Sequence, residues 1–136
     1  MAKRACLDAG PISLYYQKNP PEEIKALIKN VKNKKISALV CDMIFVEVFK
    51  HLCIAGGKDY AANCIRSFQI NVPYQSISLT TELIIEAGLL KCQFRKILSY
   101  NDCLSITLAL KNNAEFHTTE KELPEIPRLR IVKYKF

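Results

Sequence analysis

A short apolar run in the first third of the chain most constrains what it can fold into. Residues 36–41 have the sequence Ile-Ser-Ala-Leu-Val-Cys and follow a break of lysines and an asparagine. A compact run of this length is typical of a strand buried on both faces, and such strands belong to parallel sheets covered by helices. The run therefore predicts an α/β fold.

The rest of the chain alternates between strand and helix patterns. We expect strands at about 3–8, 36–41, 74–78, 115–119 and 128–134, with the last at a sheet edge. We expect helices at about 11–17, 22–31, 43–54, 58–70, 81–94 and 99–112, and an irregular segment at 120–127. This alternation predicts a single domain over 1–136, an α/β/α sandwich around a mainly parallel, roughly five-stranded sheet.

Local signals place several helix ends. Pro11 suits the first position of the first helix. Asp42 is predicted to cap the helix that follows the second strand, and Gly56 with Gly57 to end it. Apolar residues of the first two helices could serve either the core or an interface between two copies of the chain: Tyr15, Tyr16, Ile24 and Ile28.

The net charge of +7 arises largely from clustered lysines and arginines. Two interpretations remain open, because such clusters occur on solvated helix faces and also attract nucleic-acid phosphates without regard to sequence. The clusters are Lys25, Lys29, Lys32, Lys34 and Lys35; Lys91, Arg95 and Lys96; and Arg128, Arg130, Lys133 and Lys135.

The cysteines and the apolar stretches indicate a cellular setting. The six cysteines are far apart and form no CxxC pair, so zinc-site spacing is absent and buried free thiols are expected. Disulfides would be unusual in a cytosol outside hyperthermophiles. The start of the chain has no apolar core suited to a signal peptide, and no stretch reaches the roughly 18 apolar residues of a membrane span. A cytoplasmic location without membrane attachment is predicted.

Four acidic residues carry the functional prediction. Asp8, Glu47, Asp102 and Glu120 lie inside hydrophobic runs or at their ends, where an unpaired charge is costly. If the first and fourth strands are neighbours where the strand order reverses, Asp8 and Glu120 meet in the crevice there. Gathered carboxylates in a basic protein predict a bound divalent cation and a polyanionic substrate, as in a metal-dependent nuclease acting on RNA.

Each acid also has a purely structural explanation. Asp8 could only cap the first helix. Glu47 could pair with Arg66 or Lys50. Asp102 completes a capping box with Ser99, which is compatible with a place near the site. Glu120 could be an ordinary loop acid, and the nearby His117 is interpreted as a strand residue rather than a ligand, whereas Thr118 and Thr119 could hydrogen-bond to phosphate or to the carboxylates.

These residues lie in four segments that together resemble the PIN-domain family, most closely the small prokaryotic VapC-type ribonuclease toxins. The resemblance covers essentially the whole chain. The segments are Leu7–Pro11, with the first acid; Phe45–Val48, with the helical glutamate; Leu98–Leu104, with the third acid at a helix start; and Thr118–Leu123, which closes the site.

The resemblance implies a fold, an activity and partners. It implies one or two Mg²⁺ or Mn²⁺ ions held by Asp8, Glu47 and Asp102 as main ligands, with Glu120 auxiliary or acting through water. It implies hydrolysis of RNA phosphodiester bonds by an endoribonuclease. It also implies a small antitoxin that covers the crevice, with a basic residue on the carboxylates, and a homodimer.

The chain departs from the family pattern in two places. The family often has Ser or Thr two positions after the first acid, where this chain has Gly10, and this removes a possible hydroxyl contact. The fourth acid is usually Asp, where this chain has Glu120, and Glu122 is a weaker substitute. These departures leave room for a catalytically degenerate PIN fold that binds RNA or acts as a scaffold.

A phospho-acceptor signalling domain is a further alternative, since it too is an α/β fold with an acidic pocket. Such a domain needs an acceptor Asp at the end of a central strand. The third predicted strand here ends in Ser76-Ile77-Ser78, with no Asp, which disfavours this alternative.

Overall fold

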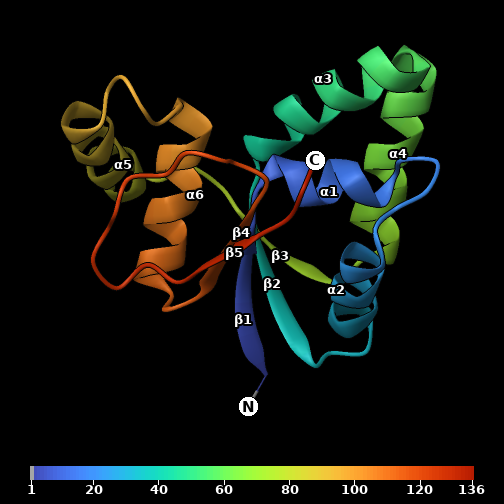
Figure 1. The fold of residues 1–136 in the computed structure, drawn as a ribbon, viewed down its shortest axis with the longest axis horizontal. Coiled ribbons are helices and arrows are strands. Elements are labelled where there is room, and N and C mark those ends of the chain that lie inside the picture. The colour runs from blue at the N-terminus through green and yellow to red at the C-terminus, as the bar shows by residue number, and fades with distance from the viewer. Residues whose placement is uncertain (1) are drawn as a thin grey trace.

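The computed structural model describes residues 2–136, which form one five-stranded sheet with helices on both faces (Figure 1). The strands are β1 (Lys3–Leu7), β2 (Ile36–Cys41), β3 (Tyr74–Ile77), β4 (Glu115–Thr118) and β5 (Ile131–Lys133). They lie in the order β3-β2-β1-β4-β5, and each neighbouring pair is parallel. The predicted α/β class, the parallel sheet and the edge position of the last strand are confirmed.

Six helices within residues 2–136 cover this sheet: α1 (Ala9–Tyr15), α2 (Glu22–Lys32), α3 (Ile44–Gly56), α4 (Lys58–Asn71), α5 (Thr81–Gln93) and α6 (Tyr100–Lys111). Figure 1 shows α1 to α4 on one side of the sheet and α5 with α6 on the other. The last helix, α6, packs against β1, β2 and β4. This arrangement is the three-layer sandwich that the alternation of patterns predicted.

The core forms where the two central strands meet the helices. Residues 5–7 of β1 and 38–41 of β2 are buried, as expected for strands covered on both faces. Ile24 and Ile28 of α2 are fully buried in the same core, whereas Tyr15 and Tyr16 are half-buried at its margin. The two isoleucines therefore serve the core and are not available for an interface.

One predicted helix start and one predicted cap are wrong. Helix α1 begins at Ala9, so Pro11 is its third residue; a proline is tolerated there because the first-turn N–H groups have no partner within the helix. Asp42 does not cap α3, which begins at Ile44. Its backbone N–H instead bonds to Ile77 O at 2.9 Å and its carboxylate accepts the Ser76 hydroxyl, so Asp42 continues the pairing of β2 with β3.

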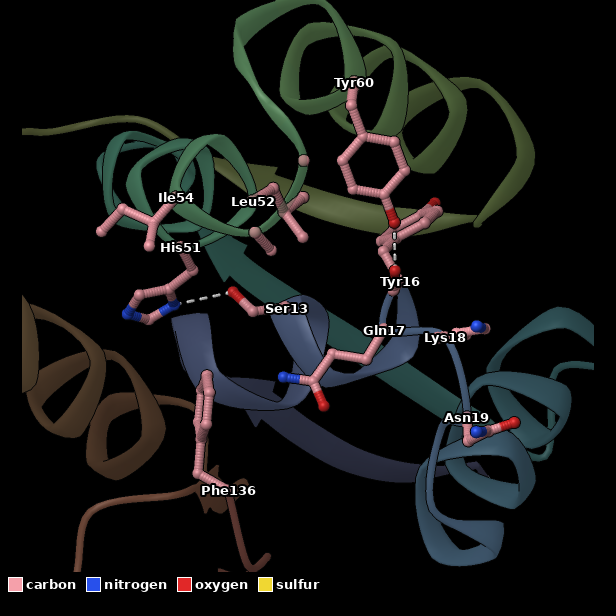
Figure 2. Close-up of a pocket in the computed structure, with 12 residues that line it drawn as sticks. Ser13, Tyr16, Gln17, Lys18, Asn19, His51, Leu52, Ile54, Tyr60 and Phe136 are labelled. Carbon is pink, nitrogen blue, oxygen red and sulfur yellow. Dashed lines mark hydrogen bonds between the residues drawn. The ribbon is translucent and has the colours of Figure 1, made fainter.

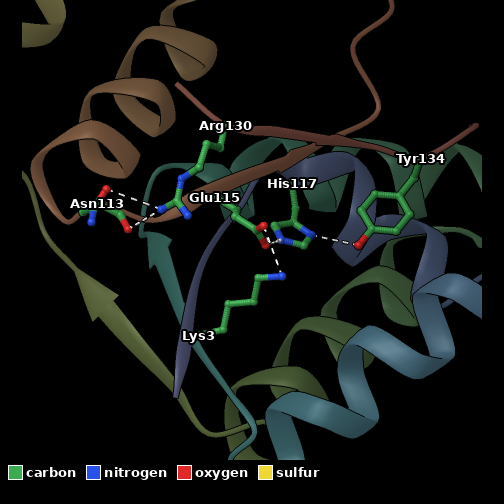
Figure 3. Close-up of polar contacts among 6 residues, drawn as sticks. All are labelled: Lys3, Asn113, Glu115, His117, Arg130 and Tyr134. Atoms are coloured by element: carbon green, nitrogen blue, oxygen red, sulfur yellow. Dashed lines mark hydrogen bonds and ion pairs between the residues drawn. The ribbon is translucent and has the colours of Figure 1, made fainter. Parts of the chain in front are cut away.

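The last strand is shorter than predicted. Arg128 has a φ of 68°, in the left-handed region, and the Leu129 N–H bonds back to Ile126 O, so a turn occupies the expected strand start. Side chains hold the short edge strand and the segment after it (Figure 3). His117 Nδ1 lies 2.8 Å from the Tyr134 hydroxyl, and Arg130 donates to Asn113 O at 2.7 Å.

Across the described residues 2–136 all six cysteines are free. Four are buried, Cys53 is partly buried and Cys92 is exposed. Burial raises the pKa of Cys6 and Cys41, which keeps both as neutral thiols and makes them poor metal ligands. No helix in residues 2–136 combines the length and apolar character that a membrane crossing requires.

Candidate active site

The strand order reverses between β2 and β4, on either side of β1. The chain passes from β1 outward through β2 and β3, and then returns to place β4 on the other side of β1. The Asp8 N–H bonds to His117 O at 3.0 Å, so the two strands stay paired up to the first acid. In open α/β sheets the crevice beyond the carboxyl ends at such a reversal is the usual ligand site.

Asp8 is buried at this point, with 4% of its surface exposed. Its Oδ2 accepts the Thr118 hydroxyl at 2.9 Å, and its Oδ1 is buried with no hydrogen-bond partner in residues 2–136. The side chain makes no capping bond to α1, so capping alone does not explain this residue. Burial, and then the charges of Asp102 and Glu47, raise the pKa of Asp8 to about 7, although the adjacent Ala9 N–H and the Thr118 hydroxyl favour the ionised form.

Glu47 lies on α3 with 28% of its side chain exposed. Its Oε1 accepts a hydrogen bond from Asn101 Nδ2 at 2.9 Å, and its Oε2 lies 3.6 Å from His51 Nε2. The structure pairs it with neither Arg66 nor Lys50, so the ion pairs proposed from the sequence are wrong.

Asp102 completes the predicted capping box at the start of α6 and is 5% exposed. Its Oδ2 accepts the Ser99 N–H at 3.2 Å, while its own N–H donates to Ser99 Oγ at 3.1 Å. Burial raises the pKa of Asp102, and the charge of Glu47 adds to the shift. The cap and a place in the acidic cluster are thus compatible.

Glu120 follows β4, and its N–H donates to Thr118 Oγ1 at 3.1 Å. One hydroxyl therefore links the first and fourth acids, because Thr118 also donates to Asp8. Burial, and then the charges of Asp102 and Glu47, raise the pKa of Glu120. A surface cleft of ≈ 550 Å³ begins at Glu120 and is bounded by Lys96, Ile97, Thr119, Lys121 and Glu122.

The glycine that departs from the family pattern has a packing reason. A Cβ built on Gly10 would lie 2.0 Å from Thr119 Oγ1 and 2.5 Å from its methyl carbon. Atoms in proteins do not approach this closely, so the Thr119 side chain or the backbone at position 10 would have to move. Thr119 therefore fills the space that a Ser or Thr side chain at position 10 would need.

The four carboxylates have the chemistry of a divalent-cation site, but they do not form a closed ligand set. All four offer oxygen, which Mg²⁺ and Mn²⁺ prefer, and the partnerless Asp8 Oδ1 is an oxygen that a cation would satisfy. In residues 2–136, however, no three His, Cys, Asp or Glu side chains stand close enough to share one ion as positioned. Glu47 and Asp102 each direct an oxygen to a protein donor.

Sequence reasoning missed two residues at this site, Asn101 and His51. His51 lies four residues after Glu47, a spacing that places two side chains on one helix face. This spacing could have predicted that His51 lies beside Glu47. No sequence pattern predicts the role of Asn101, because its contact with Glu47 joins residues 54 positions apart.

Neither a protein-family model nor a curated protein sequence matches the chain. Solved structures do resemble it. A chain of the Rickettsia felis VapBC2 structure, bound to a DNA fragment from its promoter, matches with a TM-score of 0.73 and 16% identity, covering 96% of this chain and 98% of that one. A chain of the DNA-bound Salmonella typhimurium VapBC structure matches with a TM-score of 0.71 and 16% identity, covering 98% of each.

A third similar structure is Mycobacterium tuberculosis VapC20, described as a sarcin-ricin loop cleaving toxin. It has a TM-score of 0.65 and 13% identity, covering 82% of this chain and 85% of that one. At such identities the similarity is one of fold. The chain has the PIN-type α/β fold of the VapC toxins and VapBC complexes.

Proposed function

We propose that residues 1–136 are a single PIN-like domain acting as a metal-dependent endoribonuclease. The main support is the buried Asp8, which shares the carboxyl end of the sheet with three other carboxylates and has an oxygen without a partner. Carboxylates whose pKa is raised by burial and by neighbouring like charges cluster at functional sites. The fold shared with VapC20, described as a sarcin-ricin loop cleaving toxin, supports a cleavage activity of this kind.

The residues take the following roles in this proposal. Asp8, Glu47 and Asp102 would hold Mg²⁺ or Mn²⁺, and Glu120 would be an auxiliary or water-mediated ligand. When bound, the cation supplies a more acidic water and stabilises negative charge on the phosphate. Thr118 donates to Asp8 Oδ2, which leaves the partnerless Oδ1 as the oxygen for the cation. In this proposal the RNA strand enters the cleft beside Glu120, which Lys96 and Lys121 also line.

The first test is the Asp8→Asn variant with a fluorescently labelled generic RNA and Mg²⁺ or Mn²⁺. We expect cleavage to fall by at least about 100-fold while circular dichroism stays that of the wild type. Asp42→Asn is the matched control, because Asp42 is an exposed carboxylate bound to Ser76 outside the site. Full activity in Asp8→Asn, or loss in both variants, would refute the assignment.

The VapBC neighbours support an antitoxin partner, and the resemblance to the VapC-type toxins implies a homodimer. We propose that the chain is the toxin of a toxin–antitoxin pair, bound by a small antitoxin that covers the crevice, and that it forms a homodimer. Co-expression with an adjacent short reading frame and measurement of the complex by light scattering test both. A monomer in which the neighbouring product neither binds nor inhibits would contradict this part of the proposal and leave the nuclease assignment intact.

A catalytically degenerate PIN fold that binds or scaffolds RNA is the second candidate. It is favoured by one observation, the lack of three side chains positioned to share an ion in residues 2–136. Isothermal titration with Mn²⁺ separates the two candidates, since a degenerate site would bind Mn²⁺ no better in the wild type than in Asp8→Asn.

A further inference from the structure

Glu47 is the one acid of the proposed site with a hydrogen-bonding side chain at one carboxylate oxygen and a histidine ring near the other. Asn101, at the start of α6, donates to Oε1 at 2.9 Å, and His51, one turn further along α3, lies 3.6 Å from Oε2. The Glu47 side chain is 28% exposed, so water could hydrate its charge without these partners. Because water could solvate this carboxylate, the contacts from Asn101 and His51 have a role beyond replacing lost hydration.

His51 is itself held in place. The hydroxyl of Ser13, a buried residue of α1, lies 2.8 Å from His51 Nδ1 (Figure 2). When Ser13 donates to Nδ1, the ring proton is on Nε2, which faces Glu47. The ring also meets Phe136 edge to face at a centroid distance of 5.3 Å. Ser13 of α1 and the C-terminal Phe136 thus orient this imidazole.

Asn101 is placed by the same turn that places Asp102. The capping box between Ser99 and Asp102 fixes the backbone of the first turn of α6, and Asn101 lies between those two residues. One short turn therefore supplies a proposed ligand and a donor that holds another proposed ligand from α3.

We propose that Asn101 and His51 are positioning residues that hold the Glu47 carboxylate ready for a divalent cation. This rests on the proposed function, since it concerns the same site. A free glutamate on a helix surface samples several rotamers, and fixing it before the cation arrives removes that entropic cost from binding. Asn101 makes the shorter contact and has the larger role; His51, at 3.6 Å, has the smaller one.

The test measures Mn²⁺ affinity by isothermal titration, with no RNA and no turnover. We expect Asn101→Ala to bind Mn²⁺ about 10-fold more weakly than the wild type, the lower end of the effect typical of outer-shell residues. Asn112→Ala is the matched control. Asn112 lies at the other end of α6 and donates to Leu108 O at the same 2.9 Å, so its loss removes an equivalent bond away from the site. Its Mn²⁺ affinity should equal that of the wild type.

A pair of His51 variants keeps the test valid if Asn101→Ala fails to fold. Gln carries an N–H donor near the place of Nε2, so His51→Gln should bind Mn²⁺ almost as the wild type does. His51→Ala should bind roughly 3-fold more weakly, less than the loss from Asn101→Ala. Thermal melts of all variants separate lost affinity from lost folding.

The outcomes distinguish this inference from the proposed function. Unchanged or tighter Mn²⁺ binding in Asn101→Ala, with a wild type that binds, overturns the positioning role alone; tighter binding would mean that Asn101 competes with the cation. A wild type that binds Mn²⁺ no better than Asp8→Asn overturns both.

Discussion

The acidic residues at the two ends of strand β4 have opposite electrostatic surroundings. At its start, Glu115 lies between Lys3, at 3.2 Å, and His117, at 3.3 Å (Figure 3). Past its other end, Glu120 and the neighbouring Asp8 face other carboxylates, and no lysine or arginine of residues 2–136 forms an ion pair with them. A chain of net charge +7 thus leaves its most crowded acids without cationic partners.

This contrast teaches how to interpret the cluster. A structural acid is found with its partner in the fold, as Glu115 is. Acids that repel one another and are kept buried have a cost that a cation from solution would remove. The contrast makes quantitative predictions, because neutralising an acid at each end of the strand should have opposite effects on stability.

The largest effect is expected at Asp8. Its pKa is about 7 in the folded chain against an ordinary 3.8, so between these values the folded state keeps a proton that the unfolded state releases. Wild-type stability should therefore fall as the pH rises from about 4 to about 7 and lose no more from this group above that. Asp8→Asn avoids the cost and should be more stable without metal at pH 8, by on the order of 2–4 kcal/mol.

Urea unfolding in chelator at pH 4 and pH 8 checks this prediction. The gain from Asp8→Asn should shrink to under about 1 kcal/mol at pH 4, where the folded wild-type carboxyl is protonated and the unfolded one is only partly ionised. A variant less stable than the wild type at pH 8 would show that Asp8 is an ordinary structural acid like Glu115.

Divalent cations should narrow that difference in stability, because only the wild type binds them at this site. A ligand that binds only the folded state at 100 times its dissociation constant adds about 2.7 kcal/mol. Mn²⁺ should therefore raise the melting temperature of the wild type and leave that of Asp8→Asn unchanged, as measured by differential scanning fluorimetry. Equal shifts in both proteins would place the bound cation elsewhere.

Substitutions at Gly10 test the packing beside Asp8 and Glu120. Gly10→Ala would bring a Cβ within 2.0 Å of Thr119 Oγ1 and should cost about 1–3 kcal/mol of stability. Thr119→Gly in the same chain removes the obstructing side chain and should recover much of that loss. Additive losses in the double variant, measured by urea unfolding, would contradict a direct clash.

The smallest effect is expected at the paired end. Glu115→Gln loses the contact with Lys3, which is 60% exposed, and weakens the one with His117. Stability at pH 7 should drop by roughly 0.5–1 kcal/mol, since exposed ion pairs contribute little. Added salt should shrink the difference. A gain in stability would remove the contrast between the two ends of β4.

The order of elements could be predicted because each depends on neighbours in the sequence. The buried run at 36–41, the amphipathic stripe of α2 and the capping box at Ser99 are local patterns, and all three are present. One error arose where a distant segment intervened, since Asp42 pairs with β3 instead of capping α3. Another was local, since the turn at Arg128 delays β5.

The amino-acid order alone determined the α/β class, the parallel sheet and which acids stand at strand and helix ends, since these follow from local periodicity and capping. The tertiary structure alone decided what surrounds each acid. The Thr118 bond to Asp8 spans 110 residues and the Asn101 bond to Glu47 spans 54, so no local pattern encodes them. Burial and repulsion at Asp8 likewise arise only when β1, α3 and α6 meet at one end of the sheet.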